Sequence, residues 1–158
     1  MSFLKHFFSE RDLEEAVKEN FSFLVEQYGF TYTPYCYTSQ KVKITLELGH
    51  RSPRIFIYCL GEPDFTRLIF ERIIQYFENR VLDIYFPDHS LEYNIEYMAN
   101  LLKGYMPKIV DQIDEWWIPV HFFQYRLLEE TYKKHNQQNS FLVGFKDHRD
   151  YLESKGAI

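Results

Sequence analysis

Alternation of apolar and polar side chains along residues 41–48 is the feature that most constrains how this chain can fold. The apolar members are Val42, Ile44, Leu46 and Leu48, and polar residues separate them. A period of two puts successive side chains on opposite faces, so the segment predicts a strand with one buried and one solvent face. Turn residues from Gly49 to Pro53 and an apolar run over 54–60 then predict a second strand that completes a hairpin.

A third strand is predicted over residues 30–37, which are rich in Thr and Tyr. Pro34 cannot donate to a ladder, so this strand is expected at a sheet edge. The flanking strands are expected to add four rings to the solvent face of the sheet, namely Tyr35, Tyr37, Phe56 and Tyr58. The length of 158 residues predicts a single α+β domain over residues 1–158.

Apolar residues at helical spacing predict that about four to five α-helices cover this small antiparallel sheet. One helix begins at Ser9 and ends at Gly29, and Ser90 caps a long one. Pro107 is expected to kink or break that helix near Lys103, and Pro119 to start the last long helix. Residues 81–86 are compatible with either helix or strand.

The net charge of −5 argues against a nucleic-acid binder, which needs a basic face. Seven acidic residues and only two lysines lie between Val81 and Pro119. Seven negative and two positive charges give this segment a net charge of −5, equal to that of the whole chain. An acidic surface with interspersed aromatic rings suits a basic protein partner, although a solvated helix face has the same composition.

Trp116 and Trp117 are the most unusual local feature, because two adjacent indoles cannot both point into the core from one helix face. We therefore expect one of them at a groove or the surface, where an aromatic anchor ringed by acids is typical of a binding hot spot. The alternative is that both indoles pack between the last two helices. The candidate partner-binding residues are Glu92, Tyr93, Glu96, Tyr97, Asp111, Asp114, Glu115, Trp116 and Trp117.

Motifs for catalysis, cofactors or metals are absent from the sequence. The six histidines show no zinc-site spacing, and a composite site of His121 with Asp111, Asp114 and Glu115 is the weak alternative. We therefore predict a non-enzymatic protein without cofactor or metal. Cys36 and Cys59 fit reduced core thiols, and no apolar run is long enough to span a membrane, so we predict a cytoplasmic protein.

The run FSFLVEQYGF at residues 21–30, followed by a Tyr-rich strand, a turn and KVKITLELG, resembles the opening of many small bacterial proteins. A number of those proteins look like immunity proteins of polymorphic toxin systems. The resemblance covers about the first 60 residues and transfers no functional residue. It implies a non-enzymatic inhibitor of a co-produced toxin, and such toxin domains are often basic.

Two other functions fit the same sequence. The first is a small-molecule binder or enzyme with a pocket between sheet and helices. The second is a structural domain that self-associates through the stripe formed by Tyr93, Tyr97, Leu101 and Tyr105.

Overall fold

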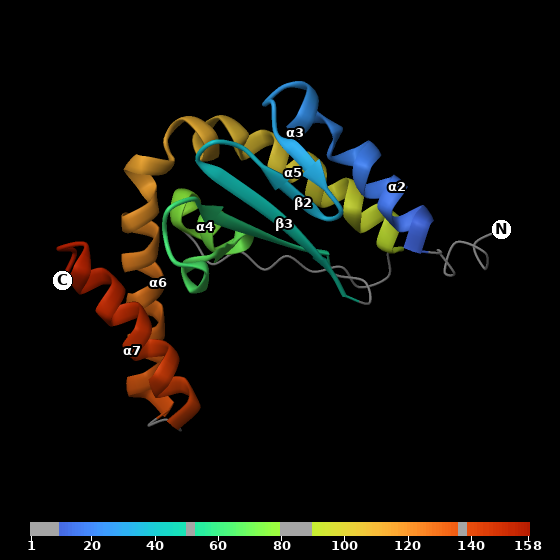
Figure 1. Ribbon diagram of the computed structural model, residues 1–158. Helices are drawn as coiled ribbons and strands as arrows, with labels where there is room; N and C mark the ends of the chain where they lie inside the picture. The colour runs from blue at the N-terminus through green and yellow to red at the C-terminus, as the bar shows by residue number, and fades with distance from the viewer. Residues whose placement is uncertain (1–9, 50–52, 80–89, 136–138) are drawn as a thin grey trace.

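The structure, a computed structural model, describes residues 10–49, 53–79, 90–135 and 139–158 (Figure 1). These residues form six α-helices, one 3-10 helix and a five-stranded antiparallel sheet, so the α+β prediction is confirmed. The helices are α2 (Glu10–Asn20), α3 (Ser22–Glu26), α4 (Phe70–Glu78), α5 (Leu91–Asp111), α6 (Ile113–His135) and α7 (Asn139–Ser154), with η1 at Asp64–Thr66. The strands are β1 (Thr31–Thr33), β2 (Cys36–Thr38), β3 (Val42–Leu48), β4 (Pro53–Cys59) and β5 (Leu68–Ile69).

The sheet runs in sequence order, β1-β2-β3-β4-β5, and its centre is the predicted hairpin. Strands β3 and β4 pair along their whole length, from Val42 opposite Cys59 to Leu48 opposite Pro53. The alternation predicted for β3 is confirmed, since Val42, Ile44 and Leu46 are buried and the residues between them are not.

The prediction of three strands is wrong, because two further pairings exist. The segment predicted as one strand is a tight hairpin of β1 and β2, turned at Pro34 and Tyr35, whose φ is 59°. Few non-glycine residues adopt a positive φ, so the sequence carries little sign of this turn. Strand β5 was not predicted, because the apolar residues Leu68 and Ile69 also fit the helical spacing of the segment that follows; the two residues pair with Ile57 and Phe56.

Several helix boundaries differ from their predicted signals. The first predicted helix is split at Phe21 into α2 and α3, so six α-helices form instead of the predicted four to five. Helix α3 ends at Glu26, and Gly29 follows with a φ of 70°. The break predicted near Lys103 is wrong, because α5 continues through Pro107 and ends at Asp111. Helix α6 starts at Ile113, six residues before Pro119, and α7 starts at Asn139.

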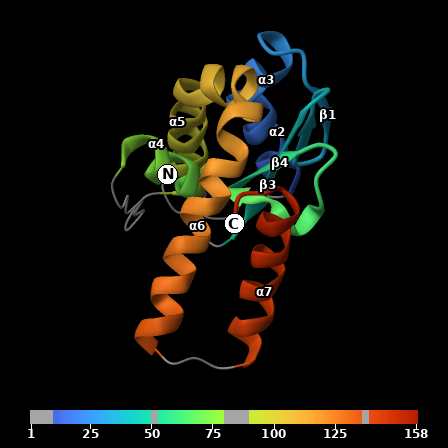
Figure 2. The same cartoon turned by 90° about the vertical axis from the view of Figure 1, so that its left-hand side faces the viewer.

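Helices α4 and α5 pack on one face of the sheet, and α2 packs against α5 (Figures 1 and 2). Helices α6 and α7 form an antiparallel pair that extends beyond the sheet (Figure 2). In the described ranges, no helix has the length and apolar character needed to cross a membrane. The ambiguous segment 81–86 lies outside the described residues.

Candidate functional site

The N-terminal half of α5 exposes two tyrosines beside two glutamates. Ser90 starts the helix as predicted, since its side chain accepts the backbone N–H of Tyr93 (3.2 Å). Tyr93 and Tyr97 are 47% and 44% exposed, and Glu92 and Glu96 are exposed next to them. Because residues four apart lie on adjacent turns of one helix face, these side chains form a single patch. We call Glu92, Tyr93, Glu96 and Tyr97 the tyrosine–glutamate face.

The three predicted acids at the other end of α5 form a separate exposed group around its junction with α6, namely Asp111, Asp114 and Glu115. Asp114 accepts a hydrogen bond from Lys41 Nζ (2.5 Å), which links this junction to the start of β3 and raises the pKa of Lys41. Asp111 lies fifteen positions after Glu96 on α5, so the two acidic groups are about 22 Å apart along the helix.

Exposed residues recur along α5 between the two acidic groups, at Asn100, Lys103, Gly104, Pro107 and Lys108. The two lysines lean to opposite sides of the helix: Lys103 Nζ lies 5.7 Å from the ring centroid of Phe23, and Lys108 Nζ lies 4.9 Å from that of Phe77. The exposed stripe of α5 is thus acidic at its ends and basic in the middle.

The expectation that one indole reaches the surface is wrong, because Trp116 and Trp117 are each only 3% exposed. Trp116 Nε1 donates to the carbonyl oxygen of Lys108 (2.9 Å), and its ring packs against Phe77. Trp117 points to the other side of α6 and packs against α7. The two indoles bind α6 to two different neighbours, so neither is available as a surface anchor.

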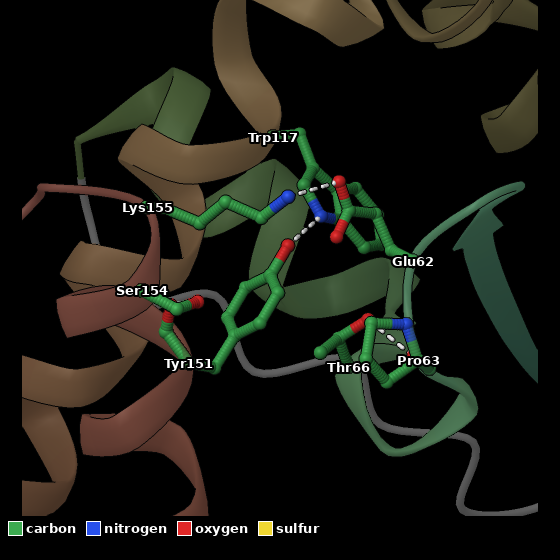
Figure 3. Close-up of polar contacts among 7 residues, drawn as sticks. All are labelled: Glu62, Pro63, Thr66, Trp117, Tyr151, Ser154 and Lys155. Carbon is green, nitrogen blue, oxygen red and sulfur yellow. Dashed lines mark hydrogen bonds and ion pairs between the residues drawn. The ribbon is translucent and has the colours of Figure 1, made fainter.

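A buried polar seam joins α6, α7 and the segment between β4 and β5 (Figure 3). Trp117 Nε1 donates to the hydroxyl of Tyr151 (2.9 Å), and Lys155 Nζ pairs with Glu62 (2.7 Å). Tyr151 is 6% exposed, whereas Lys155 is exposed at the rim. Sequence reasoning missed this seam, although Trp117 and His121 show the four-residue spacing of a shared helix face.

His121 lies in the same seam and is 1% exposed. Its ring centroid is 4.8 Å from that of Trp117, 5.3 Å from Tyr151 and 6.1 Å from His148. Both ring nitrogens are buried, and the backbone of Thr66 is the polar group that favours the protonated form of the ring. Burial lowers the pKa of His121 to about 4, and it also lowers the pKa of half-buried His148.

The weak alternative of a composite site does not form around His121, whose neighbours are aromatic rings rather than Asp111, Asp114 or Glu115. Within the described ranges, no group of three or more His, Cys, Asp or Glu side chains is arranged to hold a metal ion. Cys36 and Cys59 are free, half-buried thiols.

Two open clefts lie at the surface near the first helices. One of about 390 Å³ is lined by Tyr28, Gly29, Ser39, Gln40, Lys41, Val42 and Val110, next to the acidic junction of α5 and α6. Another of about 230 Å³ lies between α2, α3 and the β1–β2 hairpin. The larger falls at the low end of the range for small-molecule sites, but no perturbed carboxylate lines it.

Replacing Tyr151 with phenylalanine is expected to lower the free energy of unfolding by about 1–3 kcal/mol, because the buried indole N–H of Trp117 loses its acceptor. Urea denaturation measures the change. Ser154→Ala is the control, since the Ser154 hydroxyl bonds the backbone of Tyr151 at an exposed position. A Tyr151→Phe protein as stable as the parent would show that the seam bond contributes nothing.

Comparison with known proteins finds no matching family model, no similar curated protein and no similar solved structure.

Proposed function

We propose that this protein is a non-enzymatic protein-binding module that docks a basic protein on the tyrosine–glutamate face of α5. The supporting observation is that Tyr93 and Tyr97 are nearly half exposed on adjacent turns of a helix anchored to the core. Tyrosine offers a large rigid contact area at low cost in conformational entropy, which is why it is enriched at binding hot spots. The neighbouring Glu92 and Glu96 give the surface a negative charge.

Other exposed acids lie on neighbouring elements. Helix α2 packs against α5 and exposes Asp12, Glu15 and Glu19 together with Lys18. The second acidic group around Asp111 is about 22 Å away along α5. A standard interface covers about 800 Å² per partner, roughly 30 Å across, so one partner is large enough to span both groups.

The N-terminal resemblance to immunity proteins makes a co-produced toxin domain the first partner to test, with binding in the cytoplasm. An acidic surface can occupy the basic substrate site of a toxin that attacks nucleic acid, and it speeds association by electrostatic steering. The proposal of a protein-binding face stands without this identification. A basic partner that is not a toxin would remove only the immunity part.

Photocrosslinking in the native cell tests the face directly. Benzoylphenylalanine at position 97 is expected to form one covalent adduct, with a basic protein. The matched control is position 65. Phe65 is an aromatic residue of similar exposure, 48%, and it belongs to η1 rather than to α5. Adducts at both positions, an acidic partner, or a second copy of this chain as the partner would contradict the proposal.

Charge reversal tests the role of the glutamates on the partner captured in that way. Glu92→Lys/Glu96→Lys is expected to slow association about tenfold or more at low salt, with a smaller effect at high salt. The control is Glu130→Lys/Asp150→Lys, which makes the same change in net charge at exposed positions of α6 and α7. Equal effects of the two double variants, measured by stopped flow, would exclude a local role for this face.

A further inference from the structure

The outer face of the sheet, opposite α4 and α5, carries a row of aromatic rings. Phe56 and Tyr58 alternate with buried Ile57 on β4, so both rings point to this outer side and are half-buried. They lie opposite Thr45 and Lys43 of β3. No described helix packs on this face (Figures 1 and 2). Tyr37, predicted for the same side, is instead buried on the inner face.

Both outer rings have a cation held over them. The guanidinium carbon of Arg67 is 3.9 Å from the ring centroid of Phe56, and Lys43 Nζ is 4.2 Å from that of Tyr58. Arg67 is fixed in place, since Nη1 donates to Glu47 (2.9 Å) and to the Tyr58 hydroxyl (3.3 Å). The face therefore presents ordered planar groups with positive charge.

The charge of this face is opposite to that of the whole chain. Among the outward side chains of the five strands, with Arg67, there are three cations and one carboxylate, which leaves a local charge of +2. The cations are Lys43, Arg54 and Arg67, and the carboxylate is Glu47. The net charge of −5 thus says nothing about what this face attracts.

We propose that the outer face of the sheet binds single-stranded nucleic acid. Bases stack on aromatic rings and on arginine guanidinium planes, and phosphates pair with nearby lysine and arginine. Phe56 and Tyr58 are two residues apart on a strand, about 6.6 Å, which suits successive unstacked bases. Lys43 and Arg54 lie on either side of the two rings and would pair with the phosphates of the nucleic acid. An acidic peptide would use only the cations, whereas a nucleic acid would pair with the cations and also stack on the planar groups, so the nucleic acid is the occupant that uses both.

This site is independent of the tyrosine–glutamate face, because it lies on the other side of the sheet from α5. The test uses fluorescence anisotropy with a fluorescein-labelled oligouridylate of about twelve nucleotides. Salt is varied between about 50 and 200 mM NaCl, because each phosphate contact contributes about −0.7 to the logarithmic salt slope of single strands. Lys43→Gln/Arg54→Gln is expected to make the slope shallower by about 1.4.

Phe56→Leu is expected to weaken binding about tenfold, because it removes one stacking plane while keeping an apolar side chain. Phe56→Tyr keeps the ring and should bind like the parent, which separates stacking from any loss of folding. Arg149→Ala is the charge control, since Arg149 is exposed on α7.

Three outcomes overturn the proposal. The first is no binding at the lowest salt. The second is an equal loss of affinity for Arg149→Ala and for the sheet variants. The third is a polyglutamate peptide that binds as tightly as the oligonucleotide and is insensitive to Phe56→Leu, which would make the face a site for an acidic protein.

Discussion

Replacement of Trp116 by alanine is expected to lower the free energy of unfolding by about 3–5 kcal/mol, the cost of truncating a fully buried large aromatic residue. Trp116 packs against Phe77 of α4, and its indole N–H bonds the carbonyl oxygen of Lys108 in α5. One side chain thus joins α4, α5 and α6. Urea denaturation at neutral pH measures the loss.

Trp116→Phe is the control for this prediction, because it keeps a ring against Phe77 and removes only the hydrogen bond and part of the volume. We expect it to cost about half as much as alanine or less. A Trp116→Ala protein with nearly unchanged stability would mean that the indole is not part of the core. Such a result would revive the surface-anchor hypothesis that burial of the ring contradicts.

Lowering the pH from about 7 to about 4.5 is expected to destabilise the protein by up to about 3 kcal/mol through His121. The ordinary pKa of histidine is 6.5, and burial lowers that of His121 to about 4 in the folded state. Between these two values the unfolded chain binds the proton and the folded protein does not. The stabilisation is therefore complete above pH 6.5 and is lost as the pH falls toward 4.

Other titrating groups also change the free energy of unfolding over this pH range. The effect of His121 is therefore measured as the difference in pH dependence between the parent and a His121 variant. His148, facing His121 from α7, has a pKa lowered by burial and adds to the loss. Glu71 has a pKa raised by burial and acts in the opposite direction. His121→Leu should show a clearly flatter dependence of stability on pH than the parent. Parallel curves for the two proteins between pH 7 and 4.5 would refute the assignment to His121.

The central hairpin was predictable because its signal is local: alternation in β3 and a turn before β4 need no knowledge of other segments. The β1–β2 hairpin was not, since it turns at Tyr35 with a positive φ rather than at a glycine. The helix break predicted near Lys103 is absent for a reason that the local sequence does not reveal. Pro107 lies on the exposed side of α5, where the loss of one backbone hydrogen bond is tolerated.

The candidate site was predictable in part for the same reason. The second stripe on α5 correctly indicated side chains beyond the core, since Tyr93 and Tyr97 are exposed. Both adjacent indoles are buried because α6 has a neighbouring helix on each of two sides. Helix α7 covers the side of α6 opposite α5, so Trp116 faces α5 and Trp117 faces α7.

The sequential order of the five strands affects how the chain reaches this structure. Each strand pairs with the one before it, across connections of two to eight residues. Closing such short loops costs little chain entropy, so each pair of strands can form before the helices pack on the sheet. The sheet can therefore form from contacts between segments that are close in sequence. Its packing against α5, by contrast, requires contacts between residues far apart in the chain.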